Sequence, residues 1–231
     1  MTICGAGIAL VLSLIGVLNL SVAEEIIIAL LALIAIDALN ERLNLLERLE
    51  AKLNNLPSGQ KLRSRADILT PPVHAKNASE ICILVIHGSS VIVSNMGFFE
   101  DKIKNGCKIR FILLNPDSPS IQTWNLRSKF SDATPYIKSS MEQLQQLMLL
   151  PEVGKRCEVR LAEVFMPFSL FAIDLSKRSG SMIVEYAGYK LPIDERPHVH
   201  LTVTDSPYWF EYYRQQFEKV WSEATIWMPH S

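Results

Sequence analysis

Two histidines near the carboxyl end of the chain have the spacing of a phosphate or metal site. His198 and His200 are separated by one residue, and alternate residues of a β-strand point to the same face. Asp205 follows them closely in the chain. Imidazoles and a carboxylate on one surface are groups that can serve as nucleophile, acid and base in phosphodiester hydrolysis. The alternative interpretation is that both histidines fill ordinary positions at the edge or in the core of a strand.

A second group of polar residues stands where two predicted strands end. His87 and Ser89 follow one apolar run, and Asn115 and Asp117 follow the next. Ligands of open α/β sheets bind outside the carboxyl ends of the strands. These four residues therefore predict a ligand pocket, although His87 could equally be a structural histidine.

The cysteines and the net charge argue against several classes of function. The four cysteines, at positions 4, 82, 107 and 157, lack the spacing of zinc ligands or of a redox pair. We therefore expect buried, reduced thiols, with no metal and no cofactor. The net charge of −1 gives no basic field of the kind that nucleic-acid-binding proteins present, so we expect no nucleic-acid partner.

The amino-terminal residues contain two uncharged apolar runs, Ile3–Val22 and Ile26–Ile36, separated by Ala23-Glu24-Glu25. A membrane-spanning helix needs about 20 apolar residues. The first run is long enough, whereas the second is shorter and meets Asp37. The pattern predicts a transmembrane helical hairpin over residues 1–40, with the lipid bilayer as a partner.

Basic residues set the expected orientation of this hairpin. Its loop carries two glutamates, and the residues after the second run include Arg42, Arg48, Lys52, Lys61, Arg63 and Arg65. The positive-inside rule places that side in the cytoplasm, at the inner or plasma membrane. The alternatives are a cleaved signal peptide that ends at Ala23 and a helical hairpin buried in a soluble core.

Residues 41–70 are expected to form a leucine-rich stalk and a polar linker. Leu46, Leu49, Leu53 and Leu56 recur at heptad spacing. A parallel stalk would make the protein a homo-oligomer, a dimer or higher. A single amphipathic helix is the alternative, because a coiled coil needs about three or four heptads to be recognised.

Residues 71–231 are predicted to form a domain with a mixed α/β sheet flanked by helices. The run Glu80–Ile86 is continuously apolar, as in a strand buried on both faces. With the helix after it and the next strand, it predicts a parallel βαβ unit. Strands are expected over residues 80–86, 107–114, 158–164, 168–174, 181–189 and 198–204, and helices over 91–104, 120–130, 136–150 and 208–224.

Three segments carry a resemblance to the phospholipase D superfamily. They are the opening strand through Ile83–Ser89, the strand Asn105–Leu114 that leads into Asn-Pro-Asp-Ser-Pro, and the closing segment Phe217–Ala224 with the pattern F-x-x-x-W-x-x-A. The resemblance covers about residues 64–227 of the chain. It implies one half of a phospholipase D-like domain.

The chain departs from this family at the catalytic motif, H-x-K-x4-D. By motif order, Phe168 and Leu170 stand in the places of the histidine and the lysine, and Asp174 comes one residue early. Neither replacement can attack phosphorus or neutralise a phosphate. A second register, H-x-H-x4-D, runs through His198, His200 and Asp205.

We therefore expect a degenerate, non-catalytic phospholipase D-like domain on a membrane anchor. It would sense a phosphate or nucleotide-type ligand or act as an oligomerising effector, as in prokaryotic anti-phage defence. One alternative is a phosphodiesterase, a nuclease or phospholipase, that uses His198 and His200. Another is a structural membrane scaffold. Histidines that line a cleft would favour the enzyme, whereas Phe168 and Leu170 at the centre of that cleft would count against it.

Overall fold

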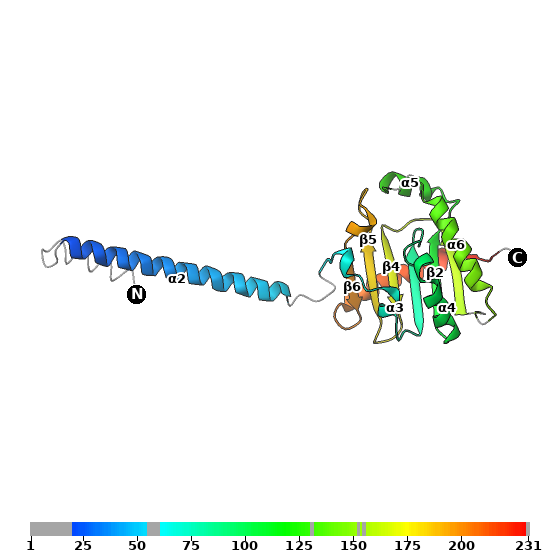
Figure 1. Ribbon diagram of the computed structural model, residues 1–231, viewed down its shortest axis with the longest axis horizontal. Coiled ribbons are helices and arrows are strands. Elements are labelled where there is room, and N and C mark those ends of the chain that lie inside the picture. Colours follow the sequence, from blue (N-terminus) through cyan, green and yellow to red (C-terminus); the bar gives the residue numbers. More distant parts are fainter. Residues whose placement is uncertain (1–19, 55–60, 130–131, 152, 154–155, 230–231) are drawn as a thin grey trace. The chain divides into compact units, whose positions relative to one another are not determined.

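The computed structural model describes residues 20–54, 61–129, 132–151, 153 and 156–229 (Figure 1). The chain divides into two compact units, Met1–Leu56 and Pro57–Ser231. The first unit contains helix α2 (Leu20–Asn54). The helices of the second unit are η2 (Arg65–Asp67), α3 (Pro71–His74), η3 (Val93–Asn95), α4 (Met96–Lys104), α5 (Ser120–Arg127), α6 (Thr134–Met148), η5 (Ile193–Glu195) and α7 (Pro207–Glu223). Its strands are β1 (Glu80–Val85), β2 (Lys108–Leu114), β3 (Cys157–Ala162), β4 (Phe168–Ile173), β5 (Ser181–Tyr186), β6 (His198–Thr202) and β7 (Thr225–Trp227).

Helix α2 corrects the prediction for the amino-terminal region. It is one continuous helix of 35 residues, and it includes Ala23-Glu24-Glu25, where the turn of a hairpin was expected. Most of the first predicted span, Ile3–Val22, lies outside the described residues. Within the described part of the chain, no helix is long and apolar enough to cross a membrane. The prediction of two transmembrane helices is therefore wrong, because the uncharged run in α2 is only 11 residues long and a span needs about 20.

The middle of α2 presents large apolar side chains on its surface. Leu39, Leu43 and Leu46 are 60%, 57% and 62% exposed, respectively. Leu49 of the predicted heptad seam is also exposed, whereas the side chain of Leu53 and all of Leu56 lie outside the described residues. These leucines are exposed among the described residues of their unit.

The second unit is built on one seven-stranded mixed sheet with the order β6-β5-β4-β1-β2-β3-β7. Strands β1, β2 and β3 are mutually parallel. Strands β4, β5 and β6 continue the sheet from β1 as an antiparallel series, and β7 pairs antiparallel with β3. Strand β1 thus has a parallel neighbour on one side and an antiparallel neighbour on the other, so the direction of the strands changes there.

Helices cover both faces of this sheet, which confirms the predicted α/β architecture (Figure 1). On one face, Ile83 and Phe111 of the sheet pack with Phe99 of α4 and Ile137 of α6. On the other face, a separate core gathers around α7, with Phe217 fully buried. Successive residues of a strand point to opposite faces, so the continuous apolar run of β1 supplies both cores.

Local sequence signals explain several element ends. Gly106 adopts φ +88° just after α4, a left-handed conformation that glycine adopts at little cost and that commonly ends helices. Pro207 opens α7, where a missing backbone N–H costs nothing. Cys82, Cys107 and Cys157 are buried and free, as expected. Strand β7 was not predicted from the sequence.

Candidate functional site

A cavity of about 400 Å³ lies at the carboxyl end of β1, where the direction of the strands changes. This is within the range of about 300–1,000 Å³ that is usual for small-molecule sites. Three parts of the chain form its walls, namely residues 65–71, 83–95 and 169–196. The sequence rule that places ligands beyond the carboxyl ends of strands therefore holds for β1.

Cross-strand pairing gives the pocket an apolar floor. Ile83 of β1 lies opposite Phe171 of β4, which in turn lies opposite Ile183 of β5. Such opposed residues share one face of the sheet, and all three line the cavity. The next row on this face replaces apolar residues by Ser169 and Glu185, which are also opposed. The floor is therefore apolar at Ile83, Phe171 and Ile183. It becomes polar at Ser169 and Glu185, which form its edge toward the carboxyl end of β1.

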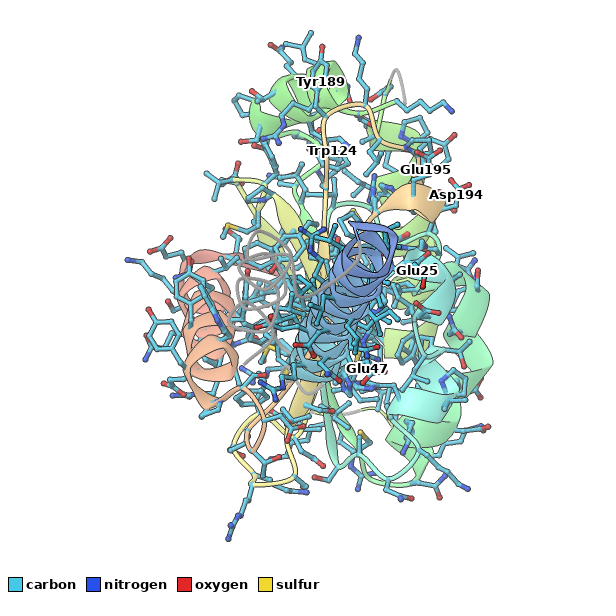
Figure 2. The ribbon with its side chains drawn as sticks, turned by 90° about the vertical axis from the view of Figure 1, so that its left-hand side faces the viewer. Glu25, Glu47, Trp124, Tyr189, Asp194 and Glu195 are labelled. Carbon is cyan, nitrogen blue, oxygen red and sulfur yellow. The ribbon has the colours of Figure 1, made fainter. Side chains whose placement is uncertain are left out.

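The polar edge holds two arginines and one carboxylate. Arg65 of η2 forms an ion pair with Glu185, and the Arg196 guanidinium lies 3.5 Å from the same carboxylate. Arg196 is only 6% exposed. Its Nε is buried and has no hydrogen-bond partner among the described residues. The guanidinium lies over the ring of Trp124 at 5.7 Å, and Trp124 is labelled in Figure 2.

The electrostatics of this edge favour an additional negative charge. Burial lowers the pKa of Arg65, and the proximity of Arg196 lowers it further, while the carboxylate of Asp194 acts in the opposite sense. Burial also lowers the pKa of Arg196. Asp194 lies on η5, at the exposed surface (Figure 2). Among the side chains that line the pocket, the Glu185 carboxylate lies between the buried Arg196 and the partly buried Arg65, which leaves an excess of positive charge.

His87 is the predicted ligand residue that the structure places in this pocket. Its Nδ1 lies 3.1 Å from the Ser89 hydroxyl, and its carbonyl oxygen accepts a hydrogen bond from Ser140. Burial lowers the pKa of His87 to about 4, with a further contribution from the charge of Arg196. His87 is therefore a neutral imidazole at pH 7. Ser89 contacts His87 but does not itself line the cavity.

Asn115 and Asp117 are not part of the pocket. Asn115 donates a hydrogen bond from Nδ2 to Glu163 at 2.8 Å, and its Oδ1 accepts one from the Asp117 backbone N–H. The Ser118 and Ser120 hydroxyls both donate to the Glu163 carbonyl oxygen. These contacts fasten the loop after β2 to the loop after β3. This pair therefore does not line the cavity at β1, and its role in ligand binding stays a prediction.

The predicted histidine pair lies on edge strand β6, beside the cavity and not in its lining. The backbone of His198 exchanges two hydrogen bonds with that of Arg63. His198 lies opposite Glu185, and His200 lies opposite Ile183, so both point to the pocket face of the sheet. Asp205 lies beyond the other end of β6, in the turn that leads to α7, where its backbone N–H donates to the Thr202 hydroxyl.

The three residues at the degenerate motif serve the packing of the sheet. Phe168 and Leu170 belong to the core beneath α7, on the face away from the pocket floor, although Leu170 also borders the cavity. Asp174 accepts hydrogen bonds from the Ser79 backbone N–H, the Ser79 hydroxyl and the Glu80 backbone N–H. Asp174 thus fastens the end of β4 to the beginning of β1.

Sequence reasoning missed four polar groups on the pocket face, namely Arg65, His74, Glu185 and Arg196. His74 packs edge-on against Phe171 and His200, with ring centroids 5.6 and 5.3 Å apart. Burial lowers its pKa to about 4, and His200 contributes. None of the four belongs to a sequence motif. The signal that could have found Glu185 is a charge inside a strand that is otherwise apolar.

Within the described residues, no group of three or more His, Cys, Asp or Glu side chains could hold a metal ion.

Comparisons with known proteins leave the family open. No family model matches the chain, and no curated protein matches it. Among solved structures, TrmBL2, described as an archaeal chromatin protein with a novel mode of DNA binding, is similar with a TM-score of 0.40 and 14% identity, over 89% of this chain and 70% of that chain. Nuc, a phospholipase D family member from Salmonella typhimurium, is similar with a TM-score of 0.37 and 9% identity, over 66% of this chain and 85% of that chain.

Likenesses of this degree assign neither a fold family nor an activity. The resemblance to the phospholipase D superfamily, which the sequence motifs carry, therefore stays a prediction.

Proposed function

We propose that residues 61–229 form a non-catalytic domain that binds a small, negatively charged ligand in the pocket at the carboxyl end of β1. The observation that carries this proposal is the cavity of about 400 Å³ whose apolar floor ends at Arg65, Glu185 and Arg196. Pockets with an apolar body and a few convergent polar groups are the usual sites of small-molecule recognition.

The residues around the pocket favour binding over hydrolysis. The described lining contains one histidine, His87, and no lysine. His198 and His200 lie outside it, and the fold surrounds His198 so that it is only 2% exposed. A phosphodiesterase needs a nucleophile that can reach phosphorus. A histidine with this little exposure is poorly placed for an attack on a substrate.

A ligand screen on the full chain tests the proposal. Thermal unfolding is followed with a panel of organic acids, nucleotides and sugars, and a ligand present at 100 times its Kd raises the free energy of unfolding by about 2.7 kcal/mol. The variant Ser169→Phe fills the polar end of the pocket floor. The control, Ser176→Phe, places the same side chain at an exposed position in the loop after β4.

We expect ligand-dependent stabilisation of the wild type and of Ser176→Phe, and none of Ser169→Phe. Stabilisation of all three proteins by the same ligand would place its binding elsewhere and refute the proposal.

We also propose that α2 joins two copies of the chain in parallel. Ile36, Leu39, Leu43 and Leu46 follow one another at spacings of three, four and three, the spacing of a coiled-coil seam, and all four are more than half exposed. This seam has a different heptad register from the one predicted through Leu46 and Leu49, and it leaves Leu49 outside the seam. In that register Arg42 and Glu47 flank the seam, and a parallel partner brings Arg42 of one helix to Glu47 of the other. This charge complementarity favours a second copy as the cover of the exposed leucines.

Sedimentation velocity tests this arrangement. Leu43→Glu places a charge in the seam and should yield monomers, whereas Leu45→Glu, at a position outside the seam, should leave the dimer intact. Arg42→Glu should weaken the dimer, and adding Glu47→Arg should restore it. A wild-type monomer, or equal effects of the two leucine substitutions, would contradict the arrangement.

A further inference from the structure

The excess positive charge in the pocket restricts the charge that the head group of the ligand can carry. Arg65 and Arg196 together carry two positive charges, and Glu185 carries one negative charge. A monoanion brings these three side chains of the pocket lining to neutrality. A dianionic phosphate monoester would leave a buried negative charge, which is costly in a low-dielectric site.

Arg196 has unused capacity for hydrogen bonding. Its contact with Glu185, at 3.5 Å, is at the outer limit for a hydrogen bond, and its buried Nε has no partner among the described residues. A guanidinium matches a carboxylate through two parallel N–H···O bonds of about 2.7–2.9 Å. A second carboxylate beside Arg196 would satisfy donors that the protein leaves weakly bonded.

The pocket floor limits the rest of the ligand. Beyond the charged edge, the walls include Ile83, Val85, Phe171 and Ile183. Aliphatic side chains predominate, and Phe171 itself is only 8% exposed, so little aromatic surface is presented for stacking a nucleobase. Such walls suit an alkyl or arylalkyl body.

We infer that the ligand is a small amphipathic carboxylate whose head group binds Arg196 in competition with Glu185 and whose apolar body lies over Phe171. This inference rests on the proposed function and names the chemistry of the ligand. Glu185 then acts as an internal counter-ion that holds the two arginines in place when the pocket is empty. The same carboxylate repels the head group, so Glu185 limits the affinity.

Isothermal titration of the full chain with matched probes tests the inference. The probes are heptanoate and 4-phenylbutanoate, the primary amide of each, hexyl phosphate and AMP. Each amide keeps the apolar body and loses the charge. We expect each carboxylate to bind at least tenfold more tightly than its amide and more tightly than either phosphate.

Three variants locate the head group. Arg196→Gln should weaken binding of the carboxylates at least tenfold and change binding of the amides little, whereas Arg178→Gln, in an exposed loop, should change neither. Glu185→Gln should tighten binding of the carboxylates by about threefold or more, because it removes the competing charge. A purely structural role of the ion pair predicts the opposite sign for Glu185→Gln, and circular dichroism confirms that each variant is folded.

Several results would overturn the inference. They are equal binding of acid and amide, a preference for hexyl phosphate or AMP, weaker binding of the acids to Glu185→Gln, or no binding of any carboxylate. The proposed function has a separate test in Ser169→Phe. If a phosphate ligand binds the wild type and is lost in Ser169→Phe, the pocket remains a site for a negatively charged ligand and only the carboxylate assignment fails.

Discussion

Two clusters of arginine and carboxylate groups on the sheet differ in their charge balance. On the α7 side, Arg110 of β2 donates two hydrogen bonds of 2.8 Å to Glu218 and lies 3.2 Å from Glu80. Its guanidinium also lies over the rings of Phe217 and Trp221, at 4.9 and 5.3 Å. Burial alone would lower the pKa of Arg110, but the hydrogen bonds to Glu218 and the neighbouring charges raise it above its ordinary value. Here two carboxylates share one arginine.

At the pocket the ratio is reversed, because two arginines share one carboxylate. Arg65 and Arg196 both reach Glu185, and burial lowers the pKa of both. Both Arg110 and Arg196 have a buried Nε without a hydrogen-bond partner among the described residues, but the terminal nitrogens of Arg110 make two bonds of 2.8 Å to Glu218, whereas Arg196 has one contact of 3.5 Å with Glu185 and borders a cavity. The difference suggests that the Arg110 cluster stabilises the fold, whereas the Arg196 cluster is arranged for a ligand. The predictions below test this contrast.

Acidification should cause the largest loss of stability, through the two histidines on the pocket face. The pKa of His74 and of His87 is about 4 in the folded protein, against about 6.5 in an unfolded chain. Between these two pKa values the unfolded chain binds more protons than the folded protein. The free energy of unfolding therefore has its full value above pH 6.5, where both histidines are neutral in both states. The free energy of unfolding decreases as the pH falls toward 4, by up to roughly 3 kcal/mol per histidine.

Urea unfolding at several pH values between 7 and 4.5 measures this loss. The variants His74→Gln and His87→Gln should each show a smaller dependence of the unfolding free energy on pH than the wild type. An unchanged dependence in both variants would show that other groups cause the acid sensitivity.

Removing Arg110 should have the next largest effect. Arg110→Leu leaves Glu80 and Glu218 without their common partner, and we expect the free energy of unfolding to fall by about 2 kcal/mol. Urea unfolding at pH 7 measures it, with Arg178→Leu in an exposed loop as the control. A loss below about 0.5 kcal/mol would mean that the Arg110 cluster contributes little to the fold.

The equivalent substitution at the pocket should lower the free energy of unfolding much less. Arg196→Leu removes a buried charge that is only partly balanced, and Glu185 keeps its ion pair with Arg65. We expect a change of less than about 1 kcal/mol in the absence of ligand. If Arg196→Leu and Arg110→Leu destabilise the protein equally, the distinction between the two clusters fails.

The smallest expected effect concerns hydrolysis. Wild type, His198→Ala and His200→Ala should show the same negligible activity on phosphodiester substrates, because both histidines lie outside the lining of the pocket. A chromogenic phosphodiester and a nuclease assay measure this. Clear activity of the wild type that either substitution abolishes would establish the enzyme alternative.

The sequence predicted the sheet better than the pocket, for a physical reason. The strands around β1 are runs of apolar residues long enough to show their burial on both faces, and their bounds were predicted to within a few residues. Strand β7 spans only Thr225–Trp227, too short for a periodic pattern. Chain direction and strand order depend on contacts that no single run contains.

The candidate site was predicted only in part, because its residues are distant in the chain. The rule for carboxyl strand ends found His87, but it also selected Asn115 and Asp117, whose loop bonds to the loop after β3. Arg65 lies in a stretch expected to be a linker, and Arg196 follows a short helix. Nothing in either local sequence shows that both side chains will reach one carboxylate.

The strand order also dictates when the pocket can form during translation. Strand β1 is at the centre of the sheet, between β2 and β4, and the two pocket arginines are 131 positions apart, from 65 to 196. At 5–20 residues per second, the ribosome needs roughly ten seconds to extend the chain from one arginine to the other. Strand β4 (Phe168–Ile173) is made before Arg196, and until it emerges the apolar residues of β1 lack it as a partner. A nascent chain that stalls before β4 emerges would expose apolar surface of the kind that chaperones bind, and its pocket would still be incomplete.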